Sequence, residues 1–363
     1  MRLFQNAGLY PRYLPRLDAL DSGPATFAAR RDAFLADRFG ACHLLQPVLA
    51  GAADAFFTNA DDARLQRRWA REHGLSAAAT PEQILLAQIE EHRTEVLYNL
   101  DPLRFGSDFV RRLPGHVRCA IAWRAAPSPG ADFAAYDRVV CNFPAILAGY
   151  AARGWKTAWF APAHDPEMDR YAARTDRPVD VVFVGGYTRH HRRRAEILEA
   201  VAQGLRGRNV RLHLDRSRAT ALAESLPGRL LPLAKHRRPP EIRAASAAPV
   251  FGRALYEALA GAKIVLNGAV DMAGDERGNM RCFEAMGCGA LMVSDAGRYP
   301  PGMEDGRTLL AYASPQDAVR AIERALADDG ERRRIAAAGH RAMVQEYSKD
   351  AQWRAFESLV AAA

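Results

Sequence analysis

Strand-like and helix-like segments alternate along almost the whole chain, and this pattern limits the fold more than any other feature. Short apolar runs rich in β-branched residues are followed by amphipathic stretches, in units of about 30 residues. The strand-like runs are residues 2–5, 55–58, 95–99, 117–123, 136–142, 156–160, 179–184, 210–214, 229–233, 263–267, 290–294 and 308–312. Such alternation predicts an α/β protein in which parallel sheets carry helices on both faces.

The alternation is interrupted once, between residues 161 and 178. This stretch is polar, lacks a regular period and contains several prolines, which is typical of a connecting segment. A chain of 363 residues is long enough for two domains. We therefore expect two Rossmann-like, doubly wound domains. The expected parts are a first domain at 1–165, a linker at 166–178, a second domain at 179–346 and a helix at 347–363 that is a candidate to pack back on the first domain.

The composition is that of a globular protein with a real core, with 49% hydrophobic and 25% charged residues. The first fifteen residues contain no continuous apolar stretch, and no apolar run approaches the roughly 18 residues that cross a bilayer. Five cysteines are an odd number and form no CxxC pair, which argues against a zinc site and a disulfide framework. We expect a cytoplasmic protein.

The net charge of +8 comes almost entirely from arginine, because only four of the 50 basic residues are lysines. Abundant arginine and alanine indicate the codon usage of a GC-rich, bacterial genome, and scattered solvated arginines explain most of the charge. A basic surface nevertheless favours anionic ligands and membrane surfaces, so peripheral membrane contact stays open as a partner class.

One stretch, residues 263–295, combines a strand, a loop, a short helix and a second strand. Its loop is rich in Gly and Asp, and the helix is expected to begin near Asn279 and to end at Gly287 or Gly289. Glu276 and Glu284 bracket the loop and the start of the helix, with seven residues between them. This layout predicts a polar site at the carboxyl end of a strand, where open α/β sheets bind ligands.

A second loop follows the first strand of the second domain. Gly185 and Gly186 allow the backbone to approach a phosphate closely, and the helix after them offers N–H groups and the positive end of its dipole. Arginine can bind phosphate through two hydrogen bonds. The cations available here are Arg189, Arg192, Arg193 and Arg194. A tight turn followed by a solvated basic helix face would leave the same pattern.

The segment DERGNMRCFEAMGCGALMVSD resembles the nucleotide-sugar site of retaining GT-B glycosyltransferases, in which two Glu residues stand seven residues apart. With Asn279, Arg281 and the preceding YEALAGAKIVLN, it is most similar to the spore-maturation-type branch of the "glycosyl transferases group 1" proteins. DVVFVGGYTRHHRRR is similar to the first strand and glycine loop of the same domain. The resemblance covers roughly residues 135 to 345 and implies the GT-B architecture, with a cleft between its two domains.

The resemblance also implies roles for individual residues. Glu284 would accept hydrogen bonds from the ribose hydroxyls, and Glu276 would contact the transferred sugar. Arg281 would pair with the diphosphate, and a structural ion pair with Glu284 or Asp275 is the alternative. The implied nucleotide-sugar-binding residues are Gly185, Gly186, Arg193, Asn279 and Glu284, and the implied catalytic residues are Glu276, Arg281 and Arg189.

The family works without a metal, and the chain contains no Asp-x-Asp sequence to hold one at a diphosphate. The resemblance therefore implies retention of configuration and no cofactor, with a nucleotide-diphosphate sugar as the donor co-substrate. Many relatives place a histidine from the first domain beside the sugar. His43, His92 and His116 are the candidates, and the sequence selects none of them. The acceptor, the base and the sugar are not identified.

Three other functions are alternatives to glycosyl transfer. A dinucleotide-dependent oxidoreductase needs GxGxxG after its first strand, and the loop at Gly185 lacks the third glycine. A nucleotide-sugar epimerase of the same fold stays open as an alternative. So does a non-catalytic anion- or nucleic-acid-binding module, although nucleic acid is not the expected partner.

Overall fold

The computed structural model describes residues 1–187, 192–268 and 272–363, which form two compact units. The first unit consists of Met1–Ala163 and Tyr347–Ala363, and the second unit is His164–Glu346. The stretch 166–178, which the sequence predicts as a linker, lies within the second unit. Helix α8 (Glu167–Ala172) begins there and buries Met168 and Tyr171, whereas residues 173–176 are exposed.

The first unit contains a parallel sheet with the strand order β2-β1-β3-β4-β5-β6. Its strands are β1 (Leu3–Asn6), β2 (Ala55–Thr58), β3 (Val96–Asn99), β4 (Cys119–Trp123), β5 (Arg138–Cys141) and β6 (Thr157–Trp159). Its helices are α1 (Leu14–Leu20), α2 (Phe27–Asp37), η1 (Ala41–His43), α3 (Gln46–Leu49), α4 (Ala63–Glu72), α5 (Pro81–Glu91), α6 (Ser107–Val110), α7 (Pro144–Ala151) and α16 (Lys349–Ala361). Local signals set several of these bounds. The Asp62 carboxylate caps α4, and a capping box of Thr80 and Gln83 begins α5.

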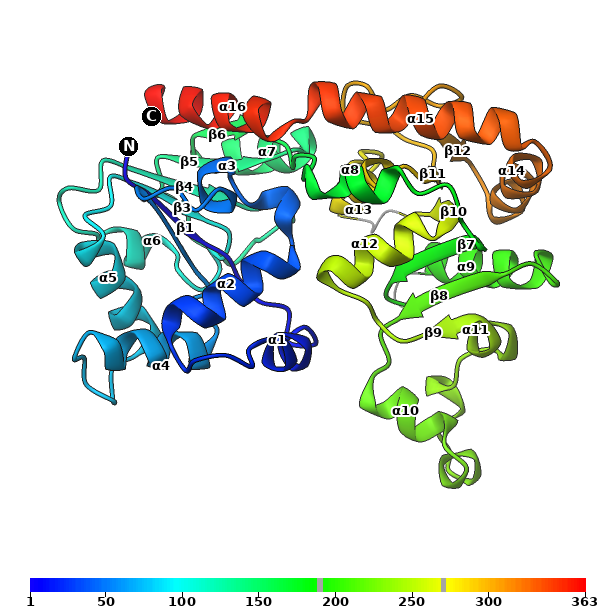
Figure 1. Ribbon diagram of the computed structural model, residues 1–363, viewed down its shortest axis with the longest axis horizontal. Helices are drawn as coiled ribbons and strands as arrows, with labels where there is room; N and C mark the ends of the chain where they lie inside the picture. The colour runs from blue at the N-terminus through cyan, green and yellow to red at the C-terminus, as the bar shows by residue number, and fades with distance from the viewer. Residues whose placement is uncertain (188–191, 269–271) are drawn as a thin grey trace. The chain divides into compact units, whose positions relative to one another are not determined.

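The second unit contains a parallel sheet with the order β12-β11-β10-β7-β8-β9 (Figure 1). Its strands are β7 (Val179–Gly185), β8 (Val210–Leu214), β9 (Ser246–Ala247), β10 (Ala262–Leu266), β11 (Leu291–Asp295) and β12 (Leu310–Tyr312). Besides α8, its helices are α9 (Arg192–Gly204), α10 (Arg218–Glu224), η2 (Pro227–Leu230), η3 (Ala234–His236), α11 (Pro240–Ala245), α12 (Gly252–Ala260), α13 (Met280–Gly287), α14 (Pro315–Ala327) and α15 (Asp329–Glu346). A core of aliphatic residues from β7, β10 and β11 packs against α9 and α14. This packing holds the sheet rigid, and the loops at the strand ends are attached to it.

Both sheets are doubly wound, and each therefore has a point at which the strand order reverses direction. In the first unit the reversal lies between β1 and β3, and in the second unit between β7 and β10. The loops that leave two such strands run to opposite faces of the sheet and open a crevice at the carboxyl ends. The topology alone thus predicts one ligand-binding edge in each unit.

One predicted strand is wrong. Residues 229–233 do not form a strand: η2 and a turn occupy this region, between Pro227 and Pro232. Proline lacks the N–H that a sheet ladder requires, so an apolar run between two prolines is a poor strand. The edge strand of the sheet is instead β9, whose two residues are too few to give a recognisable pattern.

Helix α16 completes the first unit from the far end of the sequence. The Lys349 ammonium group is buried and donates hydrogen bonds to the carbonyl oxygens of Ala41 and Leu44, both at 2.7 Å. Further along the helix, Phe356 packs against Tyr98 of β3, with ring centroids 5.1 Å apart. Residues 349–361 are thus part of the core of the first unit.

Candidate functional site

The strand-order reversal of the second unit brings the end of β7 beside the end of β10. Gly185 is the last residue of β7, and Asn267 and Gly268 follow β10. Arg194, in the first turn of α9, donates to the Gly268 carbonyl at 2.7 Å, and the hydroxyl of Tyr312 donates to the Asn267 carbonyl at 2.7 Å. Side chains from α9 and β12 therefore hold the backbone of residues 267–268 in place at this edge.

A network of amide groups joins β10 to the start of α13. Asn267 and Asn279 exchange side-chain hydrogen bonds of 3.2 Å in both directions, and Asn267 also donates to the Ser294 hydroxyl at 3.0 Å. Asn279 is the residue before the first turn of α13, yet its side chain does not cap that helix. Asn279 thus leaves the first N–H groups of α13 without a cap from its own side chain, and free N–H groups at a helix start suit an anion.

Arg281 and Glu284 form a direct ion pair on α13, with Nη1 and Oε2 2.5 Å apart. Glu284 is 2% exposed, and its side chain lies in the second turn of the helix. Burial raises the pKa of Glu284, and the nearby Arg281 opposes that shift. Arg281 is the more exposed of the two side chains, at 17%. The pairing that the sequence left as an alternative is therefore present.

Glu276 has different neighbours from the other predicted residues. It is 7% exposed, and its Oε1 lies 3.5 Å from Arg298. Residues 275–277 run beside residues 296–298 so closely that a Cβ on Gly297 would lie 2.4 Å from the Asp275 carbonyl oxygen. Glu276 thus lies against the segment that follows β11, where it pairs with Arg298. Arg281 pairs instead with Glu284.

Sequence reasoning missed Arg277, which is the anchor of this loop. Its Nε lies 2.6 Å from the Asp295 carboxylate, at the carboxyl end of β11, and both residues are buried. Its other nitrogens donate to the carbonyls of Glu276, at 3.0 Å, and Ala296, at 2.8 Å. The signal available in the sequence was the unusual placement of an arginine inside an otherwise acidic and glycine-rich loop.

The remaining predicted residues lie on the β7 side of the edge. Gly185 ends its strand, and a Cβ there would lie 3.0 Å from the Phe183 ring. Gly186 follows in the loop, and Arg193 is exposed in the first turn of α9. Arg189 lies outside the described residues. The structure therefore puts Gly185, Gly186 and Arg193 on one strand–helix unit and Asn279, Arg281 and Glu284 on another.

The first unit has a polar edge of its own at the carboxyl ends of β1, β2 and β3. The Asn6 amide donates to the Asn99 side chain at 2.9 Å, across the strand-order reversal. Asp61 accepts the backbone N–H of Leu9 at 2.9 Å, and burial is the main cause of its raised pKa. Asp101 lies close enough to Asp61 to raise that pKa further. Neither carboxylate was singled out as a site residue from the sequence.

The three candidate histidines of the first unit separate by their position on the sheet. His43 packs at a tilt against Trp123 at the end of β4, with ring centroids 4.6 Å apart, and lies on the carboxyl side of the sheet. Burial and the Lys349 ammonium lower the pKa of His43 to about 3, so the ring is neutral. His92 contacts the Leu3 carbonyl at the amino end of β1, and His116 precedes the amino end of β4. Position on the sheet therefore favours His43.

The part of the chain that the structure describes contains no cluster of three or more His, Cys, Asp or Glu side chains arranged to hold a metal ion. No helix within it is long and apolar enough to span a bilayer. All five cysteines are buried and unpaired thiols.

Comparisons with known proteins agree with the two-unit α/β fold. Residues 189–358 match the glycosyl transferase-like family model. Comparison with curated proteins gives no match. Among solved structures, HepE of Anabaena in complex with UDP and glucose aligns over 100% of both chains, with 13% identity and a TM-score of 0.58.

Two further structures extend the comparison. A glycosyltransferase from Rickettsia africae covers 99% of this chain and 97% of its own, with 9% identity and a TM-score of 0.56. TarM of S. aureus covers 77% of this chain, with 11% identity and a TM-score of 0.53, and the aligned part spans 59% of TarM. Residues 189–358, which are slightly less than half of the chain, are thus similar to the glycosyl transferase-like family. At these identities the solved structures show the fold alone, and this fold is the GT-B architecture.

Proposed function

We propose that this protein transfers a sugar from a nucleotide-diphosphate sugar to an acceptor, and that the donor binds at the carboxyl edge of the second unit. The observation that carries the proposal is the strand-order reversal between β7 and β10, which brings Gly185 beside Asn267 and Gly268. HepE, which has the same fold, binds UDP and glucose. A nucleoside diphosphate is therefore the ligand class that best suits this edge.

Two helix N-termini supply the diphosphate contacts in this proposal. Helix α9 begins with three consecutive arginines, and α13 begins with N–H groups that the Asn279 side chain does not cap. A helix N-terminus carries about half a positive charge, which attracts phosphate oxygens. As the glycosidic bond breaks, negative charge grows on the departing diphosphate, and cations and N–H groups already in place stabilise it. Arg193 is the proposed cation on the α9 side.

On the α13 side, Arg281 and Glu284 act as a pair. Arg281 is the more exposed partner, so its guanidinium is the group that contacts the diphosphate. Glu284 holds that guanidinium through Oε2 and offers its second oxygen to the ribose hydroxyls. Glu276 is proposed to contact the transferred sugar, in a loop that Arg277 holds against β11. Retention of configuration and independence of a metal remain part of the proposal.

The acceptor is proposed to bind through the polar edge of the first unit. Asp61 is largely buried and has a raised pKa, with Asp101 beside it. A carboxylate in that state can accept a hydroxyl proton or hydrogen-bond the hydroxyl of an incoming acceptor. A hydroxyl-bearing acceptor therefore suits these residues.

The donor site is tested by thermal unfolding with a panel of nucleoside diphosphates and their sugars. We expect one nucleotide to raise the melting temperature, since a ligand at about 100 times its Kd stabilises the folded protein by about 2.7 kcal/mol. Glu284→Gln should lose most of that shift, because it removes the negative charge and puts an NH2 donor in place of one carboxylate oxygen, which weakens the contacts with the ribose hydroxyls and with Arg281. Glu304→Gln, which changes an exposed carboxylate paired with Arg307, is the matched control and should keep it.

Two outcomes would contradict the proposal. The donor site is wrong if no nucleotide stabilises the wild-type protein, or if Glu284→Gln retains the full shift. Glycosyl transfer is wrong if incubation with the donor alone yields an epimer of the donor sugar, since that product belongs to an epimerase.

A further inference from the structure

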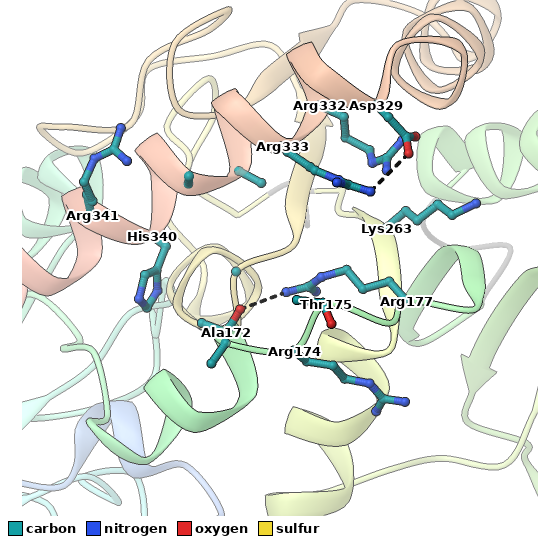
Figure 2. Close-up of a pocket in the computed structure, with 14 residues that line it drawn as sticks. Ala172, Arg174, Thr175, Arg177, Lys263, Asp329, Arg332, Arg333, His340 and Arg341 are labelled. Atoms are coloured by element: carbon teal, nitrogen blue, oxygen red, sulfur yellow. Dashed lines mark hydrogen bonds and ion pairs between the residues drawn. The ribbon is translucent and has the colours of Figure 1, made fainter.

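A hollow of about 450 Å³ lies in the second unit, at the amino ends of the strands, whereas the proposed donor site lies at their carboxyl ends (Figure 2). Lys263 at the start of β10 and Gly289 just before β11 line it, together with residues 172–177 and one face of α15. The donor site lies at the carboxyl ends of the same strands. Five residues of β10 at about 3.3 Å each put roughly 16 Å between the two edges.

The lining of this hollow is strongly cationic. Its cationic side chains are Arg174, Arg177, Lys263, Arg332, Arg333 and Arg341, and its carboxylate is Asp329. Asp329 contacts both Arg332 and Arg333, Asp180 lies 2.7 Å from Lys263, and Glu257 lies 3.3 Å from Arg174. Three carboxylates thus face six cationic side chains, so the positive charge is only partly neutralised. In Figure 2, Arg333 extends from α15 toward the hollow, and Arg177 and Lys263 lie on the side away from the helix.

Arg177 is the most informative of these residues because it is half-buried and its guanidinium contacts backbone carbonyl oxygens. Its guanidinium donates to the carbonyl oxygens of Ala262 and Cys288, both at 3.1 Å, and to that of Ala172 at 3.4 Å. Within residues 1–187, 192–268 and 272–363, no carboxylate lies within ion-pair distance of it. Burial and repulsion from Arg174 and Arg332 lower the pKa of Arg177. A nearby anion would remove that penalty.

We infer that this hollow is a second anion-binding site, which takes a small molecule bearing one or two phosphate groups. Its volume lies within the range of small-molecule sites, about 300–1,000 Å³. Guanidinium groups bind phosphate oxygens through paired hydrogen bonds, and Arg333 and Arg177 present two such groups from different segments. This site goes beyond the proposed transfer reaction, and neither depends on the other.

The site has a defined place in the chain. Residues 172–177 follow the point at which the chain enters the second unit, and α15 is the last helix before the chain leaves it at Glu346. An anion held by Arg177 and Arg333 would join these two segments. The bound state of the second unit is therefore expected to be more stable than the free state, by mass action.

Isothermal titration of the full-length protein with inorganic pyrophosphate tests the inference. The informative variants are Arg333→Gln and the double variant Arg333→Gln/Lys263→Gln, which leave Arg177 and its backbone contacts unchanged. Each charged hydrogen bond contributes about 1.5–3 kcal/mol, so we expect binding to weaken at least about tenfold. The matched control is Arg320→Gln. Arg320 is 68% exposed and lies 3.3 Å from Asp317, much as Arg333 is 75% exposed and lies 3.3 Å from Asp329.

Pyrophosphate also resembles the diphosphate of a donor, so the two sites must be separated. In the double variant, the nucleotide that stabilises the wild-type protein should retain its full thermal shift. The inference is overturned if the wild-type protein binds no pyrophosphate, or binds it no more tightly than the double variant does. It is also overturned if Arg320→Gln weakens binding equally, because the effect would then be one of net charge. An unchanged pyrophosphate affinity with a lost nucleotide shift would contradict both site assignments at once.

Discussion

Arg277 and Asp295 form a buried ion pair that holds the loop before α13 against the end of β11. Arg277→Ala would leave the Asp295 carboxylate buried without its cation. Removing one partner of a buried pair costs about 3–5 kcal/mol, and we expect a loss of that size in the free energy of unfolding, measured by urea titration. Arg298→Ala is the control. Arg298 is 68% exposed and pairs with the exposed Asp275 at 3.0 Å and more loosely with Glu276 at 3.5 Å, so its loss should cost less than the loss of Arg277.

The double variant Arg277→Met/Asp295→Leu shows whether the loss of stability in Arg277→Ala comes from the unpaired charge or from the lost side-chain packing. Replacing both charges with apolar groups of similar volume is often neutral, so this variant should recover much of the stability. It should still bind nucleotide less tightly than the wild-type protein, because Arg277 also holds the Glu276 backbone. An Arg277→Ala variant as stable as Arg298→Ala would show that the pair is not a structural anchor.

Residues differ in how far their roles could be predicted from sequence. Arg281 and Glu284 are three positions apart on one helix, so their pairing follows from helical geometry and was foreseen as an alternative. Arg277 and Asp295 are partners only because the loop turns back on β11, which no local pattern encodes. Asp61 and Asp101 meet only because β2 and β3 flank β1, so their proximity depends on strand order.

Two glycines of α15 should respond in opposite ways to substitution by alanine, because their tertiary packing differs. A Cβ on Gly339 would lie 2.6 Å from the Thr308 carbonyl oxygen, whereas a Cβ on Gly330 would lie 3.4 Å from the Asp328 side chain. Gly→Ala within a helix ordinarily stabilises by about 1 kcal/mol. We therefore expect Gly330→Ala to be neutral or stabilising and Gly339→Ala to be destabilising, as measured by thermal unfolding. Equal effects of the two substitutions would mean that α15 can shift away from residue 308 at little cost.

Elements were predictable where a local signal was complete. Thr80, Pro81 and Gln83 specify the start of α5 by themselves, and Ala55–Thr58 is the strand β2 that its β-propensity predicts. The apolar residues around Leu230 satisfied a strand pattern but lie between prolines, and the side chain of Leu230 is 90% exposed. Apolar character alone thus failed to predict the sheet position, since the ladder also needs backbone N–H groups.

At the scale of the whole molecule, the first unit depends on α16. Phe356 is fully buried and packs against Tyr98 and Phe160, so Phe356→Ala should remove about 3–5 kcal/mol from the stability of that unit. Calorimetry should show the transition of the first unit at a lower temperature, while the transition that responds to nucleotide stays in place. Arg354→Ala, at an exposed position of the same helix, is the control. A Phe356→Ala protein whose two transitions both remain unchanged would exclude α16 from the core.

The architecture as a whole was accessible from the sequence because alternation and a specific motif agree on it. The periodicity predicts two doubly wound domains, and the resemblance over residues 135–345 indicates the GT-B fold that the comparisons support. The order of strands within each sheet could not be predicted, because it depends on which face each crossover helix covers. For that reason the two points at which the strand order reverses became visible only with the structure.

The return of α16 to the first unit has a consequence for biosynthesis. Residues 164–346 are continuous in sequence, so the second unit can fold as soon as the ribosome has released it. The first unit begins earlier in the chain but lacks Phe356 until the second unit has also been translated. Maturation of the first unit therefore waits for translation of the second. Until then Tyr98 and Phe160 lack the aromatic side chain that packs against them.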